Sequence, residues 1–160
     1  MKDYEFRSVS TKDGGFKAKV EVYDASKNDT FTTDYCNKTP VHTDLDNAMQ
    51  KLLFHVGNII HADIPGLFVD SYYRQPTGNN ELICIYCSCH VDKAPQPLSI
   101  AVRILLGETE YEWIDQLLED LSLCEREALL YIQKGKRYGV EGFVDLSFLE
   151  DENRELDKAA

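Results

Sequence analysis

Three of the five cysteines and one of the four histidines lie within residues 81–92, in the segment ELICIYCSCHVD. Cysteine and histidine are the usual ligands of structural zinc, so the candidate metal ligands are Cys84, Cys87, Cys89 and His90. Such a site takes a second ligand pair, and the chain has no second C-x-x-C and no H-x-x-x-H. We therefore expect no metal and no other cofactor.

A strand is the alternative interpretation of this segment. Because side chains alternate along a strand, Cys84 and Cys87 then point to opposite faces and do not converge on one ion. One of these faces carries only apolar residues and cysteines, where cysteine behaves as a small hydrophobic residue. Its members are Ile83, Ile85, Cys87, Cys89 and Val91. This pattern predicts that Cys87 and Cys89 are buried thiols on the helix-covered face of a central strand.

The common sequence signatures of catalysis are missing from the chain. It contains no Walker loop, G-x-G-x-x-G, G-x-S-x-G or H-E-x-x-H. Cys89 and His90 are adjacent, but in a strand they point to opposite faces and do not form a nucleophile and base. We therefore expect no enzymatic activity.

The segment QKGKRYG, residues 133–139, is the one basic cluster in the last third. It is either the cationic end of a helix that stops at Gly135 or Gly139, or a contact for phosphate or an acidic partner. In the second interpretation the contacts come from Lys134, Lys136 and Arg137.

Negative charge is concentrated in the last third of the chain. Residues 1–107 contain 13 acidic and 11 basic side chains, whereas residues 108–160 contain 15 acidic and 6 basic ones. A surface of this sign repels a phosphate backbone, so binding to duplex nucleic acid is disfavoured. The acidic residues either only keep the chain in solution or form a contact surface for a basic protein.

Hydrophobic spacing predicts six strands. Short β-prone segments occur in two groups of three, with turn residues between them at hairpin spacing. The predicted strands are residues 4–10, 16–24, 30–36, 67–75, 81–91 and 98–106. Between the groups, residues 44–61 repeat apolar side chains every three or four positions, which indicates a helix. Thr43 and Asp46 form a variant of a capping box at its start.

The second helical region carries two sets of apolar residues. Most of them form one stripe that includes Leu117, Leu121 and Cys124, but Leu123 and Leu130 fall on roughly the opposite side of an unbroken helix. Three interpretations remain. Ser122 and Glu125 form a capping box that restarts the helix, the helix is continuous and its second face is buried by self-association, or the two leucines are exposed.

These elements predict an α+β fold of order βββα-βββα. One antiparallel sheet of about six strands is expected to carry both main helices on one face. The length suits a single domain, which we place at residues 1–149, followed by a flexible acidic tail at 150–160. No apolar run approaches the 18 residues of a membrane span, so we expect a cytoplasmic protein without membrane contact. The odd number of cysteines predicts free thiols.

The order of the segments also supports a resemblance. The segments HTDLDNAMQKLLFHVGNII, YYRQPTGNNELICIYC and EWIDQLLEDLSLCEREALLYIQKGKR, with the acidic tail, resemble in layout small uncharacterised proteins carried by bacteriophages and prophages. The resemblance implies an accessory role in a virus or mobile element. It supplies no catalytic residue.

Three classes of function follow. The first is a non-catalytic binding or assembly protein whose acidic third contacts a basic protein or a second copy of the chain. The second is an accessory protein for recombination or single-stranded nucleic acid, by analogy with other βββα units. The third is an enzyme of unknown type. The residues expected to bind the partner are Glu108, Glu110, Glu112, Asp115, Glu119, Asp120, Leu123 and Leu130.

Overall fold

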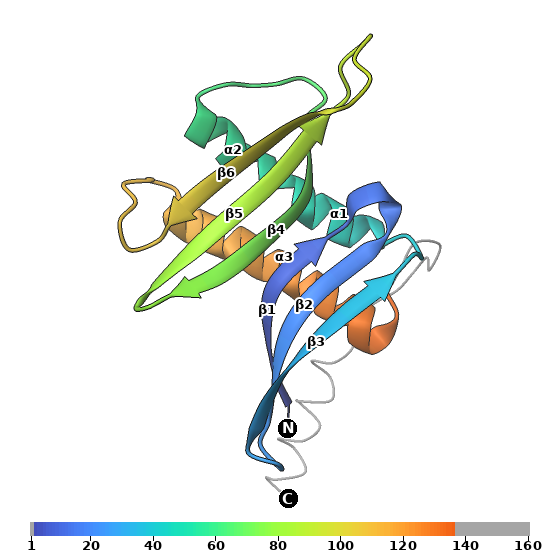
Figure 1. Ribbon diagram of the computed structural model, residues 1–160, viewed down its shortest axis with the longest axis vertical. Coiled ribbons are helices and arrows are strands. Elements are labelled where there is room, and N and C mark those ends of the chain that lie inside the picture. Colours follow the sequence, from blue (N-terminus) through green and yellow to red (C-terminus); the bar gives the residue numbers. More distant parts are fainter. Residues whose placement is uncertain (1, 137–160) are drawn as a thin grey trace, which may run out of the picture.

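Six strands form one antiparallel sheet in the computed structural model, which describes residues 2–136 (Figure 1). The strands are β1 (Lys2–Ser10), β2 (Phe16–Asp24), β3 (Asp29–Asn37), β4 (Phe68–Thr77), β5 (Asn80–Cys89) and β6 (Leu98–Leu105). Their order in the sheet is β3-β2-β1-β4-β5-β6. Two three-stranded meanders therefore meet at β1 and β4, and the predicted α+β fold with a single antiparallel sheet is confirmed.

The three α-helices within residues 2–136 lie on one face of the sheet (Figure 1). They are α1 (Thr43–Gln50), α2 (Leu53–Ile60) and α3 (Ile114–Lys134). No helix within residues 2–136 is long and apolar enough to cross a membrane. Arg137, Gly139, the boundary at residue 149 and the acidic tail at 150–160 lie outside the described residues.

The first helical segment is divided, where a single helix over 44–61 was expected. Lys51 and Leu52 lie between α1 and α2 with ψ angles of −26° and −17°, and the amide of His55 donates to the carbonyl of Leu52 in a tighter turn. The expected capping box at Thr43 is wrong. Instead, Nδ1 of His42 accepts a hydrogen bond from the backbone amide of Asp44 at 3.0 Å.

Helix α3 runs without a break through the expected capping box at Ser122. The Ser122 hydroxyl donates back to the carbonyl of Leu118, and the Glu125 carboxylate accepts from Arg74 on β4 at 2.9 Å. Neither side chain is therefore available to cap a new helix. The helix ends at Gly135, whose φ of 69° lies in the left-handed region that favours glycine.

The second apolar side of α3 is covered by the chain itself. Helix α1 packs along α3, Leu123 packs against the core, and Leu130 is only 7% exposed. Lys136 completes this junction because its Nζ lies 2.7 Å from a carboxylate oxygen of Asp44 and 2.9 Å from one of Glu127. Leu130 is therefore buried within the chain and Leu123 is partly buried against the core, so neither is simply exposed and neither needs self-association to be covered. Lys136 is held within the fold.

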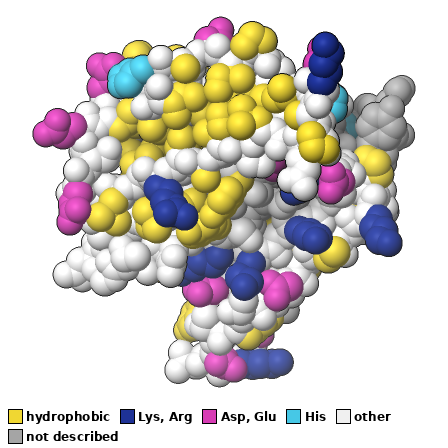
Figure 2. Space-filling view, turned by 45° about the horizontal axis from the view of Figure 1, so that its top comes forward, with side chains coloured by type: hydrophobic (Ala, Val, Ile, Leu, Met, Phe, Trp, Pro, Cys, Tyr) yellow, Lys and Arg dark blue, Asp and Glu magenta, His cyan; other side chains and the backbone are white. Residues whose placement is uncertain are grey.

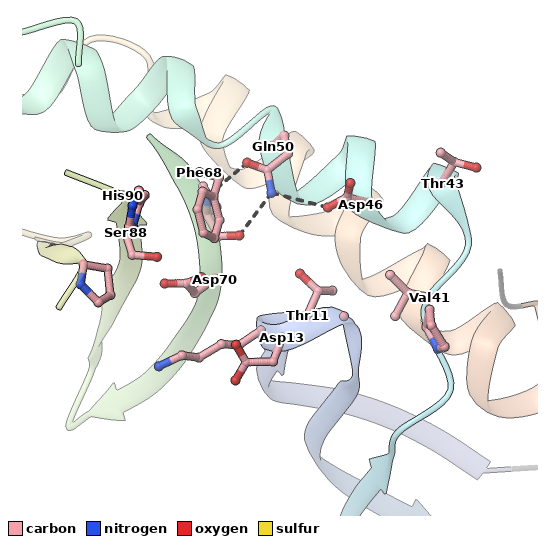
Figure 3. Close-up of a pocket in the computed structure, with 15 residues that line it drawn as sticks. Thr11, Asp13, Val41, Thr43, Asp46, Gln50, Phe68, Asp70, Ser88 and His90 are labelled. Atoms are coloured by element: carbon pink, nitrogen blue, oxygen red, sulfur yellow. Dashed lines mark hydrogen bonds between the residues drawn. The ribbon is translucent and has the colours of Figure 1, made fainter. Parts of the chain in front are cut away.

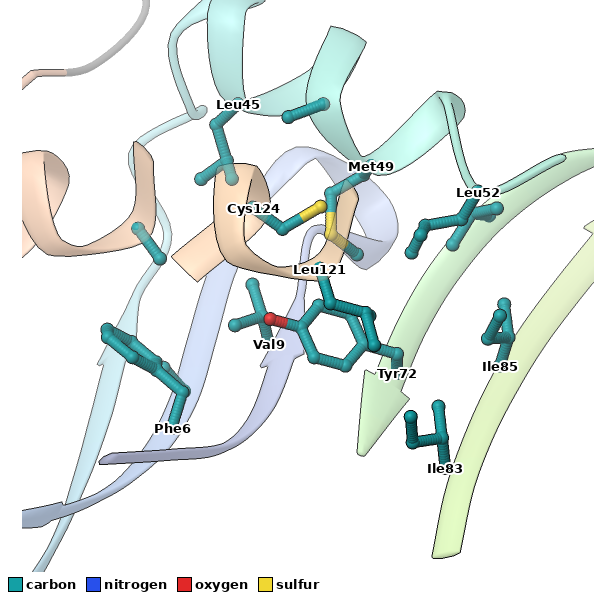
Figure 4. Close-up of a cluster of buried hydrophobic side chains, with 14 of the residues drawn as sticks. Phe6, Val9, Leu45, Met49, Leu52, Tyr72, Ile83, Ile85, Leu121 and Cys124 are labelled. Atoms are coloured by element: carbon teal, nitrogen blue, oxygen red, sulfur yellow. The ribbon is translucent and has the colours of Figure 1, made fainter. Parts of the chain in front are cut away.

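The core lies where the two meanders meet. Strands β1 and β4 pair over only three residues, Ser8–Ser10 with Tyr73–Ser71, and side chains from both meanders and from the helices fill the space beneath. Figure 4 shows Tyr72 of β4 beside Leu121 of α3 in this cluster. Tyr72 is fully buried, and within the described residues its hydroxyl has no hydrogen-bond partner.

Replacing Tyr72 with phenylalanine is expected to raise the free energy of unfolding by about 1 kcal/mol. The reason is that a buried polar group without a partner costs roughly 1 to 3 kcal/mol of desolvation. The ring and its packing are retained in phenylalanine. Urea denaturation of both proteins measures the difference, and a loss of stability would show that the hydroxyl has a partner.

Candidate functional site

Five of the predicted acidic contact residues form one exposed stretch. Glu108, Glu110 and Glu112 lie on the connection between β6 and α3, while Asp115 and Glu119 follow in the first two turns of α3. All five are exposed. Asp120 is different because it is buried and hydrogen-bonded inside the fold, so it does not belong to the surface.

An exposed aromatic pair lies within this acidic stretch. Trp113, the single tryptophan of the chain, directly precedes α3, and its ring lies 5.4 Å from that of Phe54 on α2, at an interplanar angle of 80°. Phe54 is 50% and Trp113 45% exposed. We refer to Phe54, Trp113 and the five exposed carboxylates as the acidic–aromatic surface.

A buried hydrogen-bond network holds this surface in place. His55, next to Phe54, is 0% exposed and bridges two elements. Its Nδ1 lies 2.7 Å from the Tyr111 hydroxyl on the connection, and its Nε2 lies 2.7 Å from Oδ2 of Asp120 on α3. Gln116 donates to the other Asp120 oxygen at 2.9 Å. The network therefore fixes α2, the connection and α3 relative to one another.

All members of the network are satisfied when His55 carries its proton on Nε2. Nε2–H then donates to Asp120, and Nδ1 accepts from the Tyr111 hydroxyl. Burial raises the pKa of Tyr111, so this hydroxyl stays protonated and able to donate. An Asp–His pair can serve in acid–base catalysis, but here both ring nitrogens are engaged and the ring is fully buried. Its role in this geometry is positioning.

A recess of about 490 Å³ lies beside the connection between β6 and α3. Asn58, one turn after Phe54, lies on one wall, and Tyr111 and Glu112 lie on the other. Arg103 of β6 also lines it. The recess is large enough to take a side chain from a bound molecule, and it lies beside the carboxylates of Glu110 and Glu112.

The cysteine-rich segment is a strand. Cys87 and Cys89 are buried on the face covered by the helices, as predicted, and all five cysteines are free. Val91 departs from the pattern because β5 ends at Cys89, which leaves Val91 42% exposed. Cys84 is buried too, on the opposite face of the sheet. Within residues 2–136, no three His, Cys, Asp or Glu side chains are arranged to hold a metal ion.

Only Cys36 is expected to react rapidly with a thiol reagent such as dithionitrobenzoate. It is exposed on β3, whereas the other four thiols are buried. Burial raises the pKa of Cys87 to about 11, with a further contribution from the Asp70 carboxylate, and burial also raises the pKa of Cys124. Thiolate is therefore scarce at both sites at pH 8. Cys36→Ser should abolish the fast phase, and more than one fast thiol in the native protein would contradict the burial pattern.

The uncovered face of the sheet carries a row of residues that spans five strands. Lys19, Ser8, Tyr73, Cys84 and Arg103 lie directly opposite one another from β2 to β6. The Tyr73 ring stacks on that of Tyr86 at 5.9 Å. Cations and stacked aromatic rings on one face are features of surfaces that bind single-stranded nucleic acid.

Hydrophobic side chains gather on a second part of the surface, as Figure 2 shows. Phe68, Val91 and Leu98 are exposed at the end of the sheet where β4 and β6 begin and β5 ends. Sequence reasoning placed Val91 on a buried strand face and did not single out Phe68, Leu98, Phe54 or Trp113. A signal existed for Trp113, since the single tryptophan lies within the acidic stretch, but no periodic pattern marks the others as exposed.

No family model matches this chain, and neither a curated protein nor a solved structure is significantly similar to it.

Proposed function

We propose that this protein is a non-catalytic binding or assembly protein that holds a basic segment of a partner protein on the acidic–aromatic surface. The observation that carries the proposal is the exposed Phe54–Trp113 pair among five exposed carboxylates. Tryptophan is among the residues that contribute most to protein interfaces, and an aromatic face attracts Lys and Arg cations. An accessory role in a virus or mobile element, as the layout suggests, belongs to the same proposal.

Charge favours a basic partner over a second copy of the chain. In a symmetric dimer formed through this surface, the same carboxylates would face each other across the interface and repel. Lys or Arg side chains of a partner would instead neutralise them and speed association at low salt. The adjacent recess beside Tyr111 would take one long side chain of that partner.

The test is capture from a lysate of the source organism with nuclease present. The bait is the full chain, and the matched bait carries Glu110→Lys, Glu112→Lys and Asp115→Lys. A basic protein retained by the first bait and lost from the second supports the proposal. Asp29→Lys with Asp34→Lys serves as control, because both carboxylates are exposed on β3 and distant in sequence from the surface. Equal capture by all baits contradicts the proposal.

The row of residues across β2 to β6, on the sheet face opposite the helices, favours a second candidate function. In this function the chain is an accessory protein for single-stranded nucleic acid. Lys19, Arg103 and the Tyr73–Tyr86 stack would contact phosphates and bases. Fluorescence anisotropy with a labelled oligothymidine tests this. Binding that is lost in Tyr73→Ala and Arg103→Ala, but kept in the charge-reversal bait, would support the second candidate over the first.

A further inference from the structure

A cavity of about 640 Å³ lies where the two meanders separate. Figure 3 shows side chains from four places in the chain around it: the connection after β1, the start of α1, the start of β4 and the end of β5. Apolar walls come from Val41, Phe68 and Pro97. This size is typical of small-molecule sites.

Asp70 places a carboxylate on this cavity. The residue is 8% exposed, and within residues 2–136 no hydrogen bond or ion pair reaches its carboxylate oxygens. Figure 3 shows its side chain directed between Ser88 and the connection after β1. A carboxylate that lines a cavity without a partner in the described chain can pair with a ligand of opposite charge.

A bulge in β4 directs Asp70 to this position. Val69 pairs with Cys87 and Ser71 with Tyr86, so Asp70 has no opposite residue on β5. The flanking backbone is secured from two sides. The amide and carbonyl of Val69 both bond the Gln50 side chain, at 2.9 and 3.1 Å, and the carbonyl of Asp70 accepts from the amide of Thr11 at 3.0 Å. Bulges commonly re-aim a side chain at functional sites.

We propose that this cavity binds a primary ammonium group on an aliphatic stem, with Asp70 as its counter-ion. Three donors of an ammonium group suit the oxygens that surround the cavity, which include those of Asp70, Asp46 and Ser88. The apolar walls at Val41 and Phe68 suit the stem. This chemistry belongs to both a free alkylamine and a lysine side chain, and the site is separate from the acidic–aromatic surface.

Charges around the cavity favour a cation over an anion. Asp13, Asp46 and Asp70 line it, against one ammonium group, that of Lys12. Asp13 also adopts a left-handed φ of 57°, an uncommon conformation that is enriched at binding sites. No ion pair among the described residues joins Lys12 to Asp70, although both line the cavity. Lys12 nevertheless adds positive charge at the cavity, so Lys12→Met should tighten the binding of a cationic ligand.

The test is titration of the full chain with n-butylammonium chloride at constant ionic strength. Backbone amide shifts in NMR spectra locate the site, and calorimetry gives the affinity. We expect saturable binding with the largest shifts at Asp70, Ser88 and Gln50. 1-Butanol, which has the same stem but no charge, should bind about tenfold more weakly or worse, in line with the greater strength of charge-assisted hydrogen bonds. Equal binding of the two probes would overturn the proposal.

Asp70→Asn is the decisive variant, with Asp34→Asn on β3 as the matched control. We expect Asp70→Asn to weaken butylammonium binding at least tenfold and Asp34→Asn to change it less than twofold. Because the Asp70 side chain makes no hydrogen bond or ion pair within residues 2–136 and asparagine has the same shape, the Tm of Asp70→Asn without ligand should be nearly unchanged. Unchanged affinity in Asp70→Asn, or a lower Tm without ligand, would overturn the proposal.

A second ligand distinguishes a free alkylamine from the lysine side chain of a protein. N-acetyl-lysine N-methylamide presents the same group on a peptide backbone, and the exposed Phe68 lies beside the cavity to contact that backbone. Tighter binding of this probe than of butylammonium assigns the site to a lysine of a protein. Tighter binding of butylammonium assigns it to a free amine. Trp113→Ala should leave either affinity unchanged, and a loss in that variant would overturn the separation of the two sites.

Discussion

Replacing Trp113 with alanine is expected to weaken the complex with the basic partner by about 30-fold, the effect of losing an interface anchor worth roughly 2 kcal/mol. The ring is 45% exposed and touches Phe54, so it offers a partner a large apolar surface, and in the sequence it lies between the exposed carboxylates of Glu112 and Asp115. Its removal should increase the dissociation rate more than it slows association. Surface plasmon resonance with the captured partner measures both rates.

Reversing the charge of Glu110, Glu112 and Asp115 to lysine should instead change mainly the association rate. These carboxylates are exposed, so the association rate should fall, and raising the salt concentration should reduce the difference from the wild-type chain. The melting temperature should change little, because exposed charges contribute little to folding. If Trp113→Ala and the charge reversal both leave the rates unchanged, the acidic–aromatic surface is not the binding surface.

Removing the Asp120 carboxylate is expected to lower the free energy of unfolding by about 2 to 3 kcal/mol, the cost of leaving a buried N–H donor without the carboxylate that accepted from it. In Asp120→Ala, Nε2 of the fully buried His55 loses its acceptor, and the amide of Gln116 loses its own. His55→Ala should have a comparable effect, since Asp120 and Tyr111 then lose their partner. Urea denaturation of both variants measures the cost.

A double-mutant cycle tests whether the two side chains act together. If they do, Asp120→Ala combined with His55→Ala should cost clearly less than the two single changes added. Asp115→Ala is the matched control, because Asp115 is exposed on the same helix. A loss below 1 kcal/mol in Asp120→Ala would contradict the structural role of the network. Weakened partner binding in a folded His55 variant would support its role in positioning Phe54.

Local pattern was sufficient to predict much of the fold. Strands 16–24 and 81–91 were identified within two residues of β2 and β5, because alternation of buried and exposed side chains is a property of neighbouring residues. The burial of Cys87 and Cys89 followed from the same alternation. The sequence placed the end of the last helix at Gly135 or Gly139, since a glycine after a periodic apolar segment favours a left-handed residue at the helix end, and the structure has it at Gly135.

The errors lie where distant segments meet. Ser122 and Glu125 have the spacing of a capping box, but Arg74, 51 positions before Glu125, takes the carboxylate and leaves α3 unbroken. Leu123 and Leu130 had no partner in the helical pattern because that pattern does not contain the distant segments that cover them, such as the core against which Leu123 packs. The sequence predicted Asp120 to be a surface charge, whereas in the structure its Oδ2 lies 2.7 Å from Nε2 of the buried His55.

For this protein, the sequence by itself determined which segments are strands and helices and where acidic charge accumulates. Both depend on composition and on spacing within about ten residues. Only the tertiary structure decided which side chains of a segment are covered. It exposed Phe54 and Trp113, buried Asp120, and aimed Asp70 into a cavity, because burial depends on contacts between segments that the sheet order brings together.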